Sequence, residues 1–192
     1  LISGLSKYSA ILIGCGLSKS AQKKQFLEYV IKNASARLII DADGINMLSE
    51  NINILKEARK TPIITPHPAE FSRISGLEVS YINDNRIRCA LEFAAKTKCI
   101  TVLKGAGTIT AAPDGRFAIN ASGNAGLAKG GSGDVLAGLI SGLAANPAIG
   151  VFEAAASGVY LHGRAADVLK GKYSEYGFLP SELAQEFAKM LP

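Results

Sequence analysis

Short apolar runs alternate along this chain with longer segments of helical period, and this alternation constrains the fold more than any other feature. The runs rich in Ile and Val cover residues 10–13, 37–40, 62–64 and 99–103. Helices are the usual connections between parallel strands, and the segments between these runs have room for them. The pattern therefore predicts an α/β fold with a mainly parallel central sheet.

Two further runs, residues 108–111 and 117–119, are joined through the dipeptide Asp114-Gly115. An Asp-Gly pair between strand-like runs is a strong hairpin signal, so we expect the sheet to gain an antiparallel hairpin late in the chain. Apolar periodicity predicts helices over residues 18–33, 80–98, 135–145, 151–169 and 181–190, with one more helix beginning after Pro68.

The length of 192 residues corresponds to little more than one domain at roughly 150 residues per domain. No linker or low-complexity segment divides the chain, so we expect a single domain over residues 1–192. Because the chain begins with Leu1 rather than Met, we expect it to lack its N-terminal portion.

Composition argues against several classes of protein. The net charge of +5 is spread along the chain, Trp is absent, and 6 Tyr and 7 Phe are few for a base-stacking platform, so nucleic acid is not expected as a partner. The uncharged stretch 135–152 contains Asn146 and Pro147, which favours two buried helices over a membrane span. Three cysteines without C-x-x-C spacing indicate neither a disulfide framework nor a thiolate metal site, and they favour a reducing, cytoplasmic location.

The segment 123–134 carries the strongest chemical signal. It holds five glycines within eleven residues, directly before a predicted helix. Such a loop lets backbone N–H groups face outward together, and the positive end of the helix dipole adds to an anion site. The spacing matches neither the G-x-x-x-x-G-K-[ST] phosphate loop nor G-x-G-x-x-G, so we interpret it as a different phosphate cradle.

Asp134 stands at the entrance of that helix. A carboxylate beside a bound phosphate is repelled by on the order of 4 kcal/mol at 4 Å, so its presence needs a reason. One interpretation is an aspartate that caps the helix N-terminus. The other is a general base or acid beside a transferring phosphoryl group.

Lys104 follows a buried strand and opens the glycine turn 104–108. Open α/β sheets bind ligands at the carboxyl ends of their strands, which favours contact between Lys104 and nucleotide phosphates over a solvated lysine in a turn. Lys129, inside the glycine-rich segment, is interpreted as an exposed lysine, with added charge near the phosphate as the alternative.

The remaining polar residues divide into one ligand candidate and several structural ones. His67 lies between two prolines just past a strand, and this rigid frame fits a ligand contact. We interpret His162 as a helix-packing residue. Asp41, Asp43 and Asn46 lack the further ligands of a calcium loop, so helix capping and turn formation are the preferred explanations.

Five motifs occur together and in order: GCGL at residues 14–17, DADGIN at 41–46, TPHPAE at 65–70, KGAGT at 104–108 and GNAGLAKGGSGD at 123–134. Together they resemble the NAD(P)H-hydrate dehydratase family over nearly the whole chain. The resemblance implies a ribokinase-like three-layer α/β sandwich. It also implies that the Gly-Asp segment serves as anion hole and base.

The activity implied by this resemblance is ADP-dependent dehydration of the S-epimer of NADH hydrate or NADPH hydrate, a metabolite repair reaction. NADH or NADPH is restored, and AMP and phosphate are released, with ATP as another donor. Hydroxide is a poor leaving group, and a phosphoryl group on the ring hydroxyl makes a good one. The resemblance further implies Mg²⁺ with the nucleotide, a homotetramer, and a fused N-terminal epimerase domain in some members.

By the same resemblance, Asp134 is the catalytic residue and takes the hydroxyl proton. The positions that match nucleotide-binding residues are Lys104, Gly105, Ala106, Gly107, Thr108, Gly131 and Gly133. Those that match the hydrate side are Gly16, Ser18, His67, Asn124 and Asp134. No residue is assigned as a metal ligand.

The chain departs from the family pattern at a few positions. Cys15 stands where the family usually has Pro, Ser18 where it has Gly, and Lys129 where it has Thr. Two other functions remain open: a ribokinase-like kinase of a small vitamin-precursor alcohol, which would use Asp134 in the same way, and a nucleotide-binding module without turnover.

Overall fold

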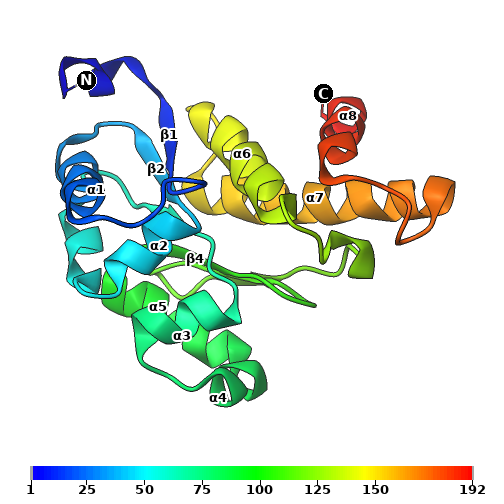
Figure 1. Ribbon diagram of the computed structural model, residues 1–192, viewed down its shortest axis with the longest axis horizontal. Coiled ribbons are helices and arrows are strands. Elements are labelled where there is room, and N and C mark those ends of the chain that lie inside the picture. Colours follow the sequence, from blue (N-terminus) through cyan, green and yellow to red (C-terminus); the bar gives the residue numbers. More distant parts are fainter. Residues whose placement is uncertain (1, 192) are drawn as a thin grey trace.

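The computed structural model describes residues 2–191 and is built around one six-stranded sheet (Figure 1). The strands lie across the sheet in their order along the chain: β1 (Ala10–Ile13), β2 (Arg37–Ile40), β3 (Ile63–Ile64), β4 (Ile100–Leu103), β5 (Ile109–Ala111) and β6 (Phe117–Ile119). Strands β1 to β4 are parallel, whereas β5 and β6 pair antiparallel. The mainly parallel sheet with a late hairpin is thus confirmed.

Helices cover both faces of the sheet and complete three layers (Figure 1). One face carries α1 (Ala21–Asn33), α2 (Asp43–Leu48), α3 (Pro68–Ser75), α4 (Val79–Asp84) and α5 (Arg86–Thr97), with the short 3₁₀ helix η2 (Ile52–Glu57). The other face carries α6 (Ser132–Ala145) and α7 (Val151–Tyr173). Along β2, Leu38 and Ile40 face the first layer and Ile39 faces the second, as the two-residue period of a strand requires.

The helices differ from their predicted bounds in instructive ways. The segment expected as one helix over residues 80–98 is broken at Asn85, whose φ of −130° and ψ of 33° are not helical, and so forms α4 and α5. The uncharged stretch 135–152 belongs to α6 and α7 with a turn between them, as predicted. Among residues 2–191, no helix combines the length and the apolar character that crossing a bilayer requires.

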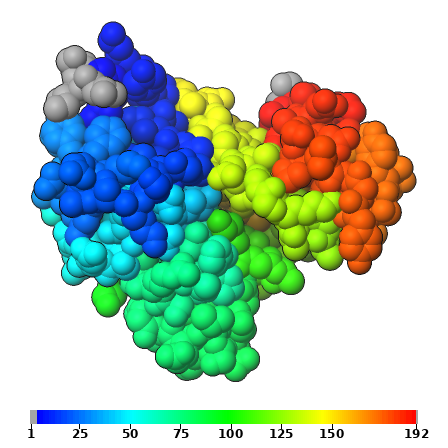
Figure 2. All heavy atoms as spheres, in the orientation of Figure 1, coloured from blue at the N-terminus to red at the C-terminus, as the bar shows by residue number. Residues whose placement is uncertain are grey.

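The C-terminal helix α8 (Pro180–Met190) packs on α6 and α7, away from the sheet. Figure 2 shows this region, orange and red, standing out as a lobe from the rest of the molecule. Phe178, Leu183 and Phe187 form its small apolar core with residues of α7. The lobe therefore supports the segment that leads into α6 from outside the main core.

Candidate active site

Four parallel strands end side by side and place polar residues at one edge of the sheet. The register pairs Ile13 with Ile40 and Ile40 with Ile64, so the residues that follow β1, β2 and β3 lie next to one another. The close approach is visible at Gly14, where a Cβ atom would lie 1.9 Å from the carbonyl oxygen of Asp41. This edge is where open α/β sheets bind their ligands.

Asp41 follows β2 and is almost fully buried, with a side chain that is 2% exposed. Its Oδ1 accepts a hydrogen bond from Lys104 Nζ at 2.9 Å. Lys104 follows β4 and also lies 3.9 Å from Glu70 Oε2. The cost of burying the Asp41 carboxylate is thus offset by a cation and a hydrogen bond.

The structure contradicts helix capping as the explanation of Asp41, Asp43 and Asn46. The N-cap of α2 is Ala42, without a side-chain hydrogen bond, so the Asp41 side chain does not cap that helix. Asp43 accepts a hydrogen bond from the backbone N–H of Ser18 at 2.7 Å. Asn46 accepts one from Arg73 at 2.9 Å. The three side chains hold neighbouring segments together, and the capping interpretation was wrong.

His67 is the N-cap of α3 and belongs to a capping box with Glu70. The His67 N–H donates to Glu70 Oε2 at 2.8 Å, and the Glu70 N–H donates to His67 Nδ1 at 3.3 Å. The helix predicted here is present and begins at Pro68 itself. The exposed ring of His67 is therefore linked through Glu70 to Lys104.

The turn that follows Lys104 is fixed by hydrogen bonds of its own. Thr108 Oγ1 donates to the Gly105 carbonyl at 2.9 Å and accepts from the Gly105 N–H at 3.3 Å. Arg86 Nη2 donates to the carbonyl oxygens of Leu103 and Lys104 at 2.9 and 3.2 Å. Burial lowers the pKa of Arg86. Ala106 and Gly107 remain exposed at the tip.

The first turn of α6 faces this edge of the sheet. Gly131 is its N-cap, with φ of 89° and no side-chain cap, so the capping interpretation of Asp134 was wrong. Within the part of the chain that the structure describes, the N–H groups of Gly133 and Asp134 have no acceptor. Free amides at a helix N-terminus attract an anion.

Gly133 leaves room between α6 and the ion pair of Asp41 and Lys104. A Cβ atom at Gly133 would lie 3.5 Å from Lys104 Nζ and 3.9 Å from Asp41 Oδ2. The free amides of α6 and the Lys104 ammonium therefore approach the same space. This arrangement can hold a phosphoryl group.

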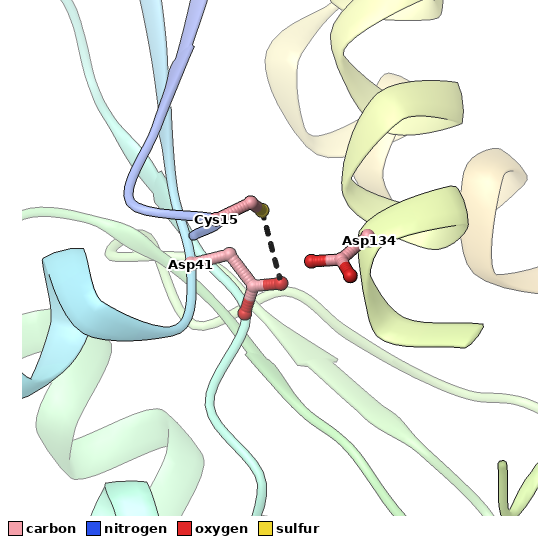
Figure 3. A group of neighbouring side chains, drawn as sticks. All are labelled: Cys15, Asp41 and Asp134. Carbon is pink, nitrogen blue, oxygen red and sulfur yellow. Dashed lines mark hydrogen bonds between the residues drawn. The ribbon is translucent and has the colours of Figure 1, made fainter. Parts of the chain in front are cut away.

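Asp134 is exposed, and its carboxylate points toward Asp41 and Cys15 (Figure 3). One donor atom from each of these three residues lies within 4.8 Å of the other two. Burial, together with the neighbouring carboxylates of Asp134 and Asp41, raises the pKa of the Cys15 thiol to about 12. Sequence reasoning had explained Asp41 by capping and turn formation and had noted Cys15 as a departure from the family pattern, so it placed neither residue in the site.

The other predicted residues of the glycine-rich segment have structural partners. Asn124 Oδ1 accepts from the Gly126 N–H at 3.0 Å, and its Nδ2 donates to Asp167 Oδ1 at 3.1 Å, which ties the segment to α7. Asn124 is the N-cap of the short 3₁₀ helix η3 (Ala125–Leu127). The structure does not bring Asn124 into contact with the other predicted residues.

Lys129 is not the exposed lysine that we expected. Its Nζ donates to the carbonyl oxygens of Glu175, Tyr176 and Phe178 at 3.1, 3.2 and 2.6 Å. The ammonium also lies 4.4 Å from the centroid of the Phe178 ring. Lys129 thus fastens the glycine-rich segment to the C-terminal lobe.

His162 is a helix-packing residue, as predicted, and it also supports the start of α6. The ring is buried, and its Nε2 lies 3.1 Å from the Ser132 carbonyl oxygen. Burial lowers the pKa of His162 to about 4, so the ring is neutral near pH 7. The start of α6 is therefore held by an uncharged hydrogen bond.

The loop after β1, which the family resemblance assigns to the hydrate, has an unusual backbone. Gly16 and Ser18 both have positive φ, 64° and 56°, and Ser18 is the one with a side chain. A non-glycine residue in this region costs roughly 1 kcal/mol. The hydrogen bond to Asp43 and a contact with Lys23 hold Ser18 there.

The layers and the strand-end site define an α/β protein of the ribokinase-like class, which confirms the predicted fold. A family model described as NAD(P)H-hydrate dehydratase matches residues 1–189. The chain belongs to the NAD(P)H-hydrate dehydratase family.

Individual relatives agree with this assignment. The chain is 39% identical to an ADP-dependent (S)-NAD(P)H-hydrate dehydratase of Neisseria meningitidis, over 92% of this chain and 60% of that protein. It is 37% identical to a bifunctional NAD(P)H-hydrate repair enzyme of Thermofilum pendens, over 97% of this chain and 36% of that protein. A crystal structure of the ADP/ATP-dependent dehydratase of Bacillus subtilis, co-crystallised with ATP and Mg²⁺, matches with a TM-score of 0.82 and 34% identity, covering 94% of this chain and 64% of that one. The chain thus spans less than two thirds of each relative.

Proposed function

We propose that this chain catalyses the ADP-dependent dehydration of the S-epimer of NADH hydrate or NADPH hydrate, releasing AMP and phosphate. The named relatives support the reaction. The observation that carries the proposal is the first turn of α6, where free amides approach the same space as the Lys104 ammonium and the Asp134 carboxylate is exposed beside them.

In the proposed reaction, the N–H groups of Gly133 and Asp134 hold oxygens of the transferring β-phosphoryl group. Asp134 accepts the proton of the ring hydroxyl as its oxygen attacks phosphorus, and the bond to AMP breaks. The C–O bond to the ring then breaks and inorganic phosphate leaves, the neighbouring ring carbon loses a proton to water, and the double bond of the reduced nicotinamide re-forms. Asp134 is suited to the proton because it is exposed and pairs with no cation among residues 2–191.

Lys104 serves a different purpose in this proposal. Its ammonium offsets the charge of Asp41, so the site does not present two uncompensated carboxylates to an incoming phosphate. The remaining nucleotide contacts are assigned to the neighbouring turn, where Gly105, Ala106 and Gly107 are exposed and Thr108 is buried, and to Gly131 at the N-cap of α6. His67, Gly16, Ser18 and Asn124 are proposed to face the hydrate.

The donor set fits Mg²⁺ that arrives with the nucleotide. Magnesium is usually held by one or two carboxylates together with substrate phosphates. Asp41 Oδ2 is the carboxylate oxygen that would hold it, since Oδ1 is occupied by Lys104. When bound, the ion neutralises charge on the phosphate oxygens. Asp134 then stays free to take the proton.

Incubation with enzymatically prepared NADH hydrate and either ADP or ATP tests this function. We expect the absorbance of reduced nicotinamide to return in step with release of AMP from ADP, or of ADP from ATP, and of phosphate. An accumulating phosphate ester of an added vitamin-precursor alcohol, with no restored nicotinamide, would instead establish the kinase. Nucleotide binding without turnover of either substrate would establish a binding module.

The setting of the enzyme is also proposed. The free thiols of Cys15, Cys89 and Cys99 support a cytoplasmic location. The word bifunctional in the name of the Thermofilum relative supports pairing with an epimerase domain. We further propose a homotetramer, which light scattering after size-exclusion chromatography would test.

A further inference from the structure

We propose that Cys15, Asp41 and Asp134 form a binding site for a thiophilic divalent cation, of which Zn²⁺ is the type. The three side chains come from separate segments: the loop after β1, the end of β2 and the first turn of α6 (Figure 3). Their donor atoms lie within 4.8 Å of one another. Zinc accepts this combination of one thiolate and two carboxylates.

A second observation points to a ligand at the same place. Asp41 is 2% exposed, and its Oδ1 is satisfied by Lys104 at 2.9 Å. For Oδ2, the one hydrogen-bond partner among residues 2–191 is the Cys15 thiol, with sulfur 4.0 Å away. A thiol is a weak donor, so a buried carboxylate oxygen faces the triad without a strong partner.

The charges balance with a divalent ion in place. Two carboxylates and one ammonium leave the group with one negative charge while the thiol is neutral. When the cation binds, the S–H bond breaks, sulfur keeps the electron pair and ligates the metal, and the proton passes to the buffer. Thiolate, two carboxylates, the Lys104 ammonium and Zn²⁺ then sum to zero.

The distances require only small side-chain movements. Zinc lies about 2.3 Å from sulfur and about 2.1 Å from carboxylate oxygen, so tetrahedral donors are separated by roughly 3.5 Å. The three donor atoms already lie within 4.8 Å of one another, and torsion of the exposed Asp134 side chain can bring them into this range. Three protein ligands leave the fourth position open toward the phosphate space. Magnesium prefers oxygen ligands, so the thiolate selects zinc over it.

Binding in this site removes Asp134 from proton transfer. Micromolar zinc should therefore inhibit the dehydratase, and this consequence rests on the proposed function. The binding itself does not rest on it. The two are separable because metal binding is measured without nucleotide or turnover.

Titration of the full chain with Co²⁺, a spectroscopic substitute for zinc, tests the site. We expect one equivalent of Co²⁺ to produce a thiolate-to-cobalt charge-transfer band, and Zn²⁺ to remove it, while millimolar Mg²⁺ leaves it in place. Cys15→Ser should abolish the band. Cys89→Ala, which alters another cysteine away from the triad, should retain it. In calorimetry, Zn²⁺ should bind Cys15→Ser and Asp134→Asn more than about tenfold more weakly than wild type.

A charge-transfer band that persists in Cys15→Ser, or equal zinc affinity in all variants, would overturn the site. Absence of any cobalt band in the wild-type chain would also overturn it. Circular dichroism establishes that each variant is folded, and Asp134→Asn carries the same test if Cys15→Ser is not. An active dehydratase that binds no zinc refutes only this site, whereas a zinc-binding chain that is inactive when assayed without zinc refutes only the proposed function.

Discussion

The carboxylates of Asp41 and Asp134 face each other across the site, but they differ in burial and in pairing. Asp41 is buried, follows a strand and is bound to Lys104 at 2.9 Å. Asp134 is exposed in the first turn of α6 and makes no ion pair within residues 2–191. A fixed, paired carboxylate holds its surroundings in place, while a free one is available to exchange a proton. We therefore call the sheet side of the site, with Asp41 and Lys104, the holding side, and the first turn of α6, with Asp134, the proposed reacting side.

Removing the free carboxylate should have the largest effect. Asp134→Asn keeps the size of the side chain but cannot take a proton, so we expect turnover to fall about a thousandfold. The free energy of unfolding should change by less than about 1 kcal/mol, since only an interaction with the helix dipole is lost. Steady-state rates and calorimetry of ADP binding measure both. Asp84→Asn, at an exposed helix end, is the control; near-normal turnover in Asp134→Asn would contradict the assignment.

Breaking the ion pair of Asp41 and Lys104 should mainly lower the free energy of unfolding. Lys104→Met leaves Asp41 buried without its cation, which should lower the free energy of unfolding by about 3–5 kcal/mol in urea denaturation. ADP binding should weaken as well, more than hydrate binding. The double variant Lys104→Met with Asp41→Asn should recover much of the stability. If the double variant is less stable than the single one, the pair does not act as described.

Lowering the pH should reduce the contribution that buried His162, which supports the start of α6, makes to the free energy of unfolding. His162 has a pKa of about 4 in the folded protein and about 6.5 in an unfolded chain. The unfolded state therefore binds more protons between these values, so stability is lost as pH falls from about 6.5 toward 4. The loss attributed to this residue reaches up to about 3 kcal/mol. Comparing urea denaturation of wild type and His162→Gln across this range isolates it; identical slopes would contradict the role of burial.

Adding a methyl group at Gly133, between Asp41 and Lys104 on one side and α6 on the other, should have the smallest effect of the four changes. Gly133→Ala places a Cβ 3.5 Å from Lys104 Nζ, in the space assigned to phosphate, without a steric clash. We expect stability to be kept and ADP affinity to fall about tenfold, or about 1.4 kcal/mol. Gly138→Ala, in the same helix with open space around it, is the matched control. Unchanged ADP affinity in Gly133→Ala would place the phosphate elsewhere.

Local pattern was enough to predict most of the fold. Strands β1 to β4 are short apolar runs, the hairpin has its Asp-Gly turn, and α3 begins at Pro68 because proline suits a first helical turn. The break at Asn85 was missed because the apolar stripe continues on both sides of it. Apolar periodicity shows which face of a helix is buried, but it does not show where one helix ends and the next begins.

The site was predictable where one segment carries the chemistry, and not where two distant segments combine. Asp134 and the glycine-rich segment were found because the unusual glycine content lies within a few residues. The Asp41 and Lys104 pair joins residues 63 positions apart and exists only through the alignment of β2 and β4 in the sheet. Lys129 was missed for the same reason, because its partners are carbonyl groups of a loop beyond α7.

The central claim is that the first turn of α6 holds phosphate beside a free Asp134. A crystal structure with Mg²⁺ and a non-hydrolysable ADP analogue tests it most directly. We predict the terminal phosphate within hydrogen-bond distance of the Gly133 and Asp134 N–H groups, with Lys104 on its other side. An analogue bound instead in the surface pocket of about 560 Å³ between α1 and α2, with the α6 turn empty, would contradict the account.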